Sequence, residues 1–224
     1  MPHARRPDVS PSHPHHVTVR MRRGTWNLRA QRCYQPLLQA FRGVRKRSGF
    51  RVTHFSVQGN HVHMLVEGAD RRAMSNGLRA LLIRFARALN GVMGARGSRF
   101  QDRYHESVLE TASAVRRCLR YVLENHARHM ARIGKMGPAV DPFSSAPWFD
   151  GYRADVLLPR AMGDPPIATA RSWLLANGWR RLGLLPGHLE ESRSRGPDRV
   201  TKRPCSSGQS PYRHSPFTSR RSMP

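Results

Sequence analysis

The alternation of apolar and polar residues predicts strands and helices in turn over the first 130 residues. Strands are expected at residues 17–22, 50–57 and 105–110, and the first of these alternates cleanly between apolar and polar side chains. Apolar residues recur at helical spacing in three other stretches: residues 34–46, the segment from Asp70 to Leu89, and residues 114–130. Thr111 or Ser113 can cap the last of these helices, because a hydroxyl oxygen accepts a hydrogen bond from the first turn.

A fourth strand is expected at residues 61–67, directly after a turn at Gly59 and Asn60. This turn joins it to residues 50–57 as an antiparallel hairpin. The alternation of a strand places His61 and His63 on one face, about 6.7 Å apart, and the apolar residues Val62, Met64 and Val66 on the other. Two imidazoles that point the same way at this spacing can hold one divalent ion.

Leu65 distinguishes this strand from an ordinary half-buried strand whose histidines face the solvent. Alternation alone is compatible with that ordinary interpretation. Leu65, however, shares the face of the two histidines and requires a cover. A covered face that carries two imidazoles is more typical of a functional site than of a solvated surface.

The order strand, helix, strand, strand, helix, strand predicts an α+β fold: a ferredoxin-like, split βαβ antiparallel sheet with helices on one face. The helix at residues 114–130 is additional to this pattern and is the natural cover for Leu65. It carries Tyr121 and Asn125 at the edge of its apolar stripe, about 6 Å apart along the axis and about 40° apart around it. A tyrosine at such an edge is more commonly a packing residue with its hydroxyl in water.

Composition indicates a polyanionic partner. The chain has 39 lysines and arginines against 14 aspartates and glutamates, a formal net charge of +25. An excess of this size favours nucleic acid first and an anionic membrane surface second. No apolar run reaches the roughly 18 residues that span a membrane, and the start lacks the apolar core of a signal peptide, so we expect a cytoplasmic protein. The three cysteines have no paired spacing that would indicate disulfides or a zinc site.

The same composition divides the chain into four parts. Residues 1–14 are rich in proline and basic residues and are expected to form a disordered arm. Residues 15–133 hold the predicted sheet and its helices. Residues 134–190 form an extension with a short tryptophan-containing helix at about 168–182, which we expect to pack back onto the domain. Residues 191–224 are rich in Ser, Arg and Pro and are expected to be a disordered basic tail.

If the additional helix does cover the histidines, the site has a clear chemical meaning. Tyr121 would supply a phenolate nucleophile, although a free phenol with a pKa of about 10 needs a cation or base to ionise it at neutral pH. A metal ion held by His61, His63 and the amide of Asn125 would stabilise the charge that builds up when a phosphate is displaced in line. The leaving group would be a 3′ hydroxyl and the product a 5′-phosphotyrosine, which conserves the phosphodiester energy for later joining.

These residues resemble the single-tyrosine HUH transposases of bacterial insertion sequences, and most closely their REP-associated tyrosine transposase branch, over residues 15–130. The His-hydrophobic-His triplet at positions 61–63 is similar to the motif that names the family. Three other segments also resemble family segments: Gln58-Gly59-Asn60, residues 100–105 and residues 121–125. The resemblance implies an enzyme that cleaves single-stranded DNA folded into hairpins and then joins strands.

The resemblance also implies a role for each site residue. Tyr121 would be the nucleophile, His61 and His63 metal ligands, and Asn125 the third ligand. Family members are associated with Mg²⁺ or Mn²⁺, although two imidazoles and an amide suit Mn²⁺ or Zn²⁺ better by ligand preference. A homodimer is compatible with the resemblance, and no membrane association is expected.

One departure concerns the third ligand. Many relatives of this branch carry a proline after the asparagine, whereas His126 follows Asn125 here, so the helix is expected to continue. Glu124, His126 and His129 are therefore rival third ligands.

Arginines outside the site are candidates for contact with DNA phosphates. Those on the helix after Asp70 lie off its apolar stripe, which is commonly only a solvated face. In a chain with this excess of positive charge, a phosphate-binding surface is also plausible. The candidate DNA-binding residues are Arg20, Arg22, Arg79, Arg84, Arg87 and Arg103.

Two other function classes compete with the nuclease. A split βαβ sheet with exposed basic residues is also the plan of a non-catalytic RNA-recognition module. Such a module requires aromatic residues on its outer strand positions, where Phe55 is a single candidate and Thr18, Arg20 and Arg22 are not aromatic. The other alternative is a structural zinc domain that uses His61, His63 and a histidine of the last helix.

Overall fold

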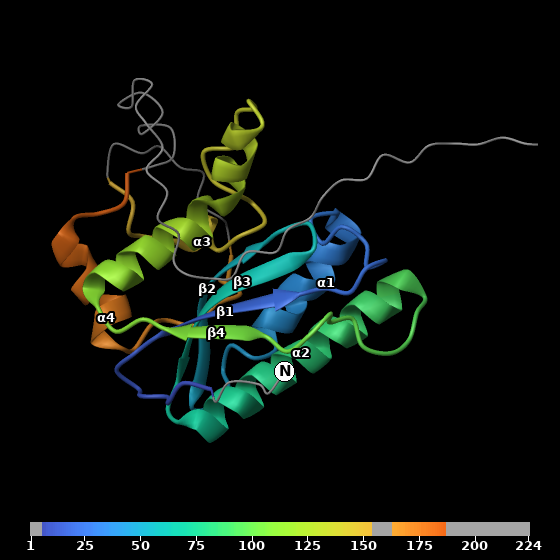
Figure 1. The fold of residues 1–224 in the computed structure, drawn as a ribbon, viewed down its shortest axis with the longest axis horizontal. Helices are drawn as coiled ribbons and strands as arrows, with labels where there is room; N and C mark the ends of the chain where they lie inside the picture. The colour runs from blue at the N-terminus through green and yellow to red at the C-terminus, as the bar shows by residue number, and fades with distance from the viewer. Residues whose placement is uncertain (1–5, 154–162, 187–224) are drawn as a thin grey trace, which may run out of the picture.

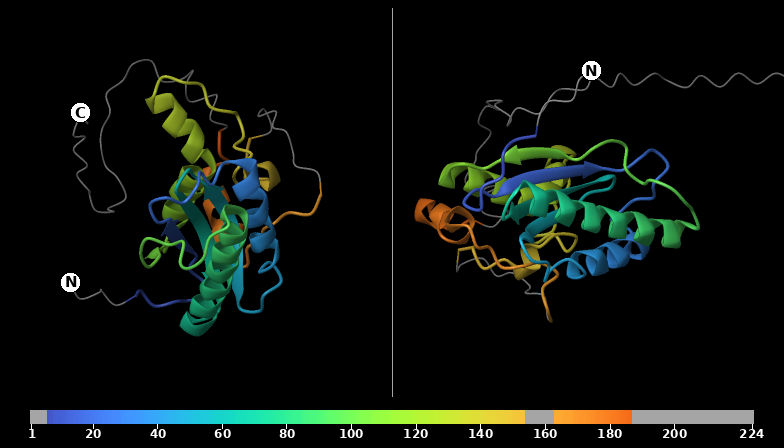
Figure 2. Two further views of the ribbon diagram at one scale, coloured as in Figure 1. Left: turned by 90° about the vertical axis from the view of Figure 1, so that its right-hand side faces the viewer. Right: turned by 90° about the horizontal axis from the view of Figure 1, so that it is seen from below.

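The computed structural model describes residues 6–153 and 163–186 and builds them around one four-stranded antiparallel sheet (Figure 1). The strand order is β2-β3-β1-β4, with β1 at His15–Arg20, β2 at Phe50–Val57, β3 at His61–Gly68 and β4 at His105–Val108. Helices α1 (Gln31–Arg42) and α2 (Arg71–Met93) cover one face, and α3 (Ala112–Arg132) lies across the other (Figures 1 and 2). This confirms the predicted ferredoxin-like fold and the additional helix that carries Tyr121.

Side-chain caps start the two long helices where the sequence predicts. The carboxylate of Asp70 accepts a hydrogen bond from Ala73 N at 2.7 Å and starts α2. The hydroxyl of Thr111 accepts from Ala114 N at 3.1 Å and starts α3, so Thr111 rather than Ser113 is the cap. Gly94 ends α2 in the left-handed conformation with φ 59°, which a glycine adopts without strain.

The two faces of β3 belong to two separate hydrophobic clusters. Val62, Met64 and Val66 pack with α1 and α2 in the larger cluster. Leu65 is fully buried in the smaller one, against the apolar side of α3 at Val115, Leu119 and Val122. The prediction that α3 covers Leu65 is therefore confirmed.

The prediction of one helix at residues 168–182 is wrong. The chain forms the four-residue helix α4 (Trp173–Ala176) and then the 3₁₀ turn η2 (Gly178–Leu182). A Cβ at Gly178 would lie 2.6 Å from the Trp173 ring, so the glycine permits a tight turn around that side chain. Only one of the two tryptophans is in a core, because Trp179 is 1% exposed and Trp173 is 51% exposed.

The extension packs on α3 as expected, and Glu67 at the end of β3 anchors it. The Glu67 carboxylate accepts hydrogen bonds from the backbone N–H groups of Arg171 and Ser172, both at 2.9 Å, and from the Ser172 hydroxyl at 2.7 Å. Leu175 and Trp179 then join the hydrophobic cluster beneath α3. A further short 3₁₀ turn, η1 (Ala146–Trp148), precedes this part of the chain.

The described part of the N-terminal segment, residues 6–14, lies along the sheet. Arg6 stacks over the Tyr104 ring and forms an ion pair with Glu106 at 3.3 Å. The Arg71 guanidinium donates a hydrogen bond to the carbonyl of Pro7. The predicted tail at residues 191–224 lies outside the described residues. Within the described chain, no helix is both long enough and apolar enough to cross a membrane.

Candidate active site

Three strands present polar side chains to α3 on the open face of the sheet. The register between β1 and β3 places Thr18 opposite His63 and Arg20 opposite His61. Strand β4, the other neighbour of β1, places His105 opposite Thr18. Paired residues share a face in an antiparallel sheet. The side chains of these three strands therefore form one polar row that runs across the sheet.

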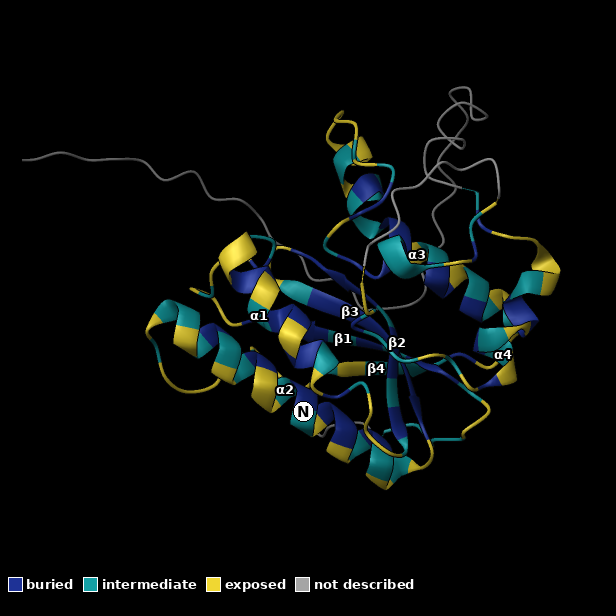
Figure 3. Ribbon diagram, turned by 180° about the vertical axis from the view of Figure 1, so that it is seen from behind, coloured by how far each residue is buried: buried dark blue, intermediate teal, exposed yellow. Residues whose placement is uncertain are grey.

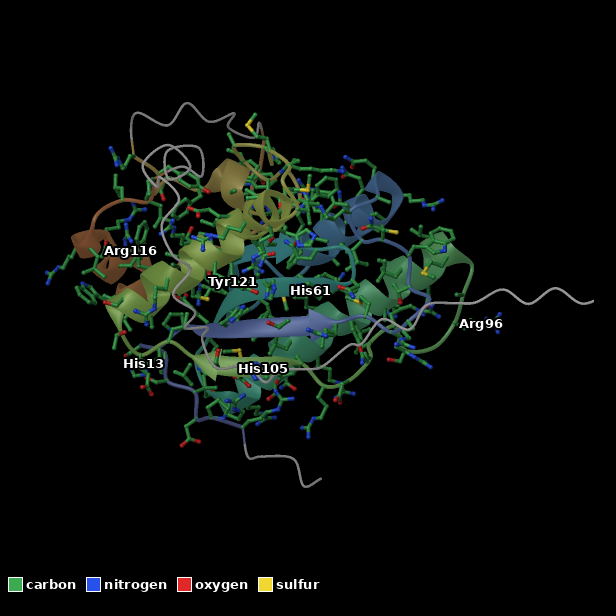
Figure 4. The ribbon with its side chains drawn as sticks, turned by 45° about the horizontal axis from the view of Figure 1, so that its top comes forward. His13, His61, Arg96, His105, Arg116 and Tyr121 are labelled. Atoms are coloured by element: carbon green, nitrogen blue, oxygen red, sulfur yellow. The ribbon has the colours of Figure 1, made fainter. Side chains whose placement is uncertain are left out.

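Helix α3 brings Tyr121 to this row (Figure 4). The Tyr121 hydroxyl lies 3.3 Å from Nε2 of His63, and the two rings meet edge to face with their centroids 5.0 Å apart. The Tyr121 side chain is 43% exposed, so a large substrate can reach its oxygen. Asn125 lies one helical turn further along α3 and is partly buried.

The second nitrogen of each histidine ring is fixed by a neighbour. Nδ1 of His63 lies 3.0 Å from the Thr18 hydroxyl and 3.2 Å from Nε2 of His16. Nδ1 of His61 lies 2.8 Å from the side-chain oxygen of Asn60. Because that oxygen only accepts, Nδ1 of His61 carries the proton and Nε2 keeps its lone pair.

Burial keeps these imidazoles neutral. Burial, followed by the charges of the neighbouring His61, His16 and Arg20, lowers the pKa of His63 to about 2. Burial, followed by the charges of Arg20 and His129, lowers the pKa of His61 to about 4. At pH 7 both rings therefore hold a free electron pair, which is the form that binds a cation.

The two rings fit part of a metal site. Their centroids are 4.7 Å apart, and a fixed second nitrogen is the usual arrangement for a metal-binding histidine. In residues 6–153 and 163–186 no group of three His, Cys, Asp or Glu side chains could hold a metal ion. The structural zinc site with a third histidine is therefore absent from this part of the chain. Further ligands would have to come from an amide such as that of Asn125, or from a bound phosphate.

The rival third ligands face different surroundings. Glu124 is buried and its carboxylate accepts hydrogen bonds from Arg120 and Arg128, each at 3.2 Å. Burial and then the charge of Arg29 lower the pKa of His126. The charge of His129 acts on both His61 and His126, and His129 lies two turns beyond Tyr121 on α3.

Comparison with known proteins assigns the chain to a family. The family model described as "Transposase IS200 like" matches residues 8–125, which is more than half of the chain and includes Tyr121. The chain belongs to the IS200-like transposase family. No curated protein sequence matches it.

One solved structure supports the fold of this IS200-like transposase. A REP-associated tyrosine transposase bound to a REP hairpin matches with a TM-score of 0.52 and 21% identity, over 65% of this chain and 82% of that one. A candidate transposase from Deinococcus radiodurans gives a TM-score of 0.37 at 12% identity, over 61% of this chain and all of the other. The first match confirms the fold, and the second is too distant to add to it.

The candidate DNA-binding arginines of this transposase fall on two faces. Arg20 and Arg103 line a hollow of about 500 Å³ together with Thr18 and His105. Arg22 is exposed just beyond β1. The three candidates on α2 lie on the opposite side of the sheet: Arg79, Arg84 and Arg87.

His16 and Thr18 are contacts of the site that the sequence analysis did not identify. The alternation of residues 17–22 places Thr18 outward, but only the register of β1 against β3 sets it opposite His63. His16 precedes the predicted strand, because β1 begins at His15.

Proposed function

We propose that this transposase is a metal-dependent endonuclease and strand transferase that cleaves single-stranded DNA through a 5′-phosphotyrosine at Tyr121. The observation that carries the proposal is the 3.3 Å contact between the Tyr121 hydroxyl and Nε2 of His63. It sets a nucleophile from α3 beside an imidazole that the strand holds in its neutral form. Membership of a transposase family supports a reaction on DNA.

The reaction is an in-line displacement at phosphorus. The phenol of Tyr121 loses its proton, its oxygen forms a bond to the phosphorus, and the bond from phosphorus to the 3′ oxygen breaks. The 3′ oxygen takes up a proton and leaves as a hydroxyl. Attack by a 3′ hydroxyl on the phosphotyrosine reverses these steps, releases Tyr121 and joins two strands.

His61, His63 and Asn125 would hold the divalent ion, for which we propose Mg²⁺ or Mn²⁺. When bound, the ion would supply a positive charge next to a phosphate oxygen and so stabilise the transition state. The roles of the chain in this step are to keep both imidazoles neutral and to fix their orientation. His16 and Thr18 do the second of these through Nδ1 of His63.

The hollow beside Thr18 would hold the strand next to the scissile phosphate. Arg20 and Arg103 line it and can contact the sugar-phosphate backbone. Single-stranded DNA suits this reaction because an unpaired phosphate can be turned into line with Tyr121. The solved relative is bound to a REP hairpin, and we propose hairpin DNA with a single-stranded flank as the substrate class here.

The test is incubation of the full chain with end-labelled hairpin DNA and Mn²⁺ or Mg²⁺, followed by a denaturing gel. We expect a labelled protein adduct with the wild type and none with Tyr121→Phe. Tyr34→Phe is the matched control, because the buried Tyr34 hydroxyl has no hydrogen-bond partner among the described residues, and it should form the adduct normally. Tight binding without cleavage under either metal would instead favour the non-catalytic nucleic-acid-binding module.

A further inference from the structure

Helices α1 and α2 carry positive charge without any acidic residue. α1 contains two arginines and α2 contains five, and neither has an aspartate or a glutamate. The solvated face of a helix normally mixes both signs, since pairs four residues apart stabilise it. Arg71 pairs with Glu106 of β4, and the one-sided charge of the remaining arginines favours a bound anion over a face adapted only to water.

Two hollows lie side by side along these helices. One of about 570 Å³ and one of about 540 Å³ share Ala80 and Arg84 as lining residues. Small, buried apolar side chains are part of each lining: Ala40 in the first hollow and Val44 in the second. The cations that line them are Arg42, Arg45, Lys46, Arg47, Arg84 and Arg87.

Arg84 joins the two hollows. A Cβ at Gly43 would lie 2.8 Å from Nη1 of Arg84, so the guanidinium lies directly over the end of α1. Asp164 is the one carboxylate among the described residues that line the hollows, and it lies 3.5 Å from Arg45. We call the two hollows together the α1–α2 groove. Its other cations face no carboxylate among the described residues that line it.

This groove lies on the side of the sheet away from Tyr121. α1 and α2 pack on the face of β3 that carries Val62 and Met64, whereas His63 faces α3. Figure 3 shows the two helices in front of the sheet, with exposed positions along both, and Figure 2 shows them on the side opposite α3. A strand held at the active site does not pass through the groove without turning around an edge of the sheet.

We propose that the α1–α2 groove is a second nucleic-acid-binding surface, which holds the backbone of a segment other than the one at Tyr121. Its row of cations matches the repeated negative charge of a phosphodiester chain. The inference goes beyond the proposed function, because the groove needs neither a metal ion nor cleavage to bind its ligand.

The shape of the groove favours a nucleic-acid strand over an anionic membrane. A bilayer meets a flat or convex surface with large apolar side chains that enter it. Here the lining is concave, and Ile83, 43% exposed, is its one exposed large apolar residue within the described chain. The charged groups surround hollows of a size that accepts phosphates and sugars.

The test measures binding of a fluorescent oligothymidylate to the full chain without divalent metal, by anisotropy at several salt concentrations. The groove variants are Arg84→Gln/Arg87→Gln and Lys46→Gln/Arg47→Gln. We expect each to weaken binding roughly tenfold near 0.1 M salt and to lower the slope of log K against log salt by about 1.4, since each single-strand contact contributes about 0.7. Native mass spectrometry with short oligonucleotides should show two bound by the wild type and one by each variant.

The control removes the same charge elsewhere on the protein. Arg72→Gln/Arg96→Gln changes two exposed arginines that do not line either hollow, and Figure 4 shows Arg96 far from Tyr121. Its slope and stoichiometry should match the wild type. An equal loss in the control, or an unchanged slope in both groove variants, would overturn the proposal. So would groove variants that lose binding to phosphatidylserine vesicles but keep binding to the oligonucleotide.

Discussion

His63 is held at both ring nitrogens by side chains from two other elements. Thr18 and His16 of β1 contact Nδ1, and Tyr121 of α3 contacts Nε2. A ring fixed on both sides cannot rotate away from Tyr121. Its orientation is therefore set by the register of β1 and by the docking of α3 together.

Substitution of Thr18 by valine tests this positioning. The valine keeps the shape of the side chain but removes the hydroxyl that fixes Nδ1 of His63. We expect the Kd for Mn²⁺, measured by isothermal titration calorimetry, to rise roughly 10- to 100-fold, as it does when such outer contacts of metal-binding histidines are lost. Thr18→Ser retains the hydroxyl and should bind like the wild type. Unchanged Mn²⁺ affinity in Thr18→Val would refute the positioning role of Thr18.

At the residue scale, the sequence predicts which face of the sheet a side chain lies on better than it predicts which residues that side chain contacts. Alternation alone predicts that His61 and His63 share a face and that Leu65 is covered on it. It does not predict that Thr18 meets His63, because a pairing register depends on the whole sheet rather than on one strand. The role of Tyr121 as nucleophile stays a prediction until the adduct is measured.

At the scale of elements, α3 is held between the sheet and the C-terminal extension. Leu65 lies on its sheet side, and Trp179 of η2 belongs to the same cluster. The three hydrogen bonds that Glu67 accepts fix the start of α4 at the end of β3. The strand that carries the two histidines therefore also anchors the segment that holds the tyrosine helix in place.

Two glycines of α2 give a matched test of the packing between this helix and the sheet. A Cβ at Gly77 would lie 2.0 Å from the Phe50 ring, whereas a Cβ at Gly91 would have no neighbour within 4 Å. We expect Gly77→Ala to lower the free energy of unfolding by about 2 kcal/mol, because Phe50 is fully buried and cannot move freely. Gly91→Ala should raise it by about 0.5–1 kcal/mol through helix propensity. Urea unfolding measures the free energy of unfolding of both variants. Equal changes in Gly77→Ala and Gly91→Ala would contradict the packing of Gly77 against Phe50.

The sequence predicts the long elements well and the short ones poorly. The helices with capping residues, α2 and α3, begin where Asp70 and Thr111 indicate. The predicted helix at residues 168–182 breaks because Gly178 turns tightly against Trp173, a contact between side chain and backbone that periodicity does not encode.

At the scale of the whole molecule, Glu106 ties together parts of the chain that are distant in sequence. Its carboxylate lies 2.9 Å from Nδ1 of His15 in β1, 3.0 Å from Arg71 at the start of α2 and 3.3 Å from Arg6 in the N-terminal segment. Burial alone would raise the pKa of Glu106, but the hydrogen bonds from His15 and Arg71 outweigh it and lower the pKa to about 2.

This lowered pKa predicts an acid-dependent stability. A carboxyl whose pKa falls on folding stabilises the fold above its ordinary value of 4.5, and this contribution disappears as the pH falls towards 2. Glu106→Gln should therefore be less stable at pH 7, by an amount on the order of 3 kcal/mol, and its stability should vary less between pH 5 and pH 2. Glu110→Gln, at an exposed glutamate just after β4, is the control. The free energy of unfolding would be measured by urea unfolding at each pH. The same dependence on pH in the wild type and in Glu106→Gln would contradict this account.

The net charge of +25 predicts a polyanionic partner but does not say where it binds. The candidate arginines look alike in sequence, and only the fold divides them. Arg20 and Arg103 line the hollow beside Thr18, and Arg84 and Arg87 lie in the groove on the opposite face. This division depends on which side of the sheet each helix covers, and it follows from the packing of the whole molecule.

The covalent intermediate is the most direct test of the central claim. The wild-type protein would be incubated with Mn²⁺ and a hairpin oligonucleotide, digested with a protease, and the nucleotide-bearing peptide sequenced by mass spectrometry. We predict a nucleotide attached through its 5′ phosphate to the peptide that contains Tyr121, with a free 3′ hydroxyl on the released strand. Attachment at another residue, or cleavage that leaves a 3′ phosphate on the DNA, would contradict the assignment of Tyr121 as the nucleophile.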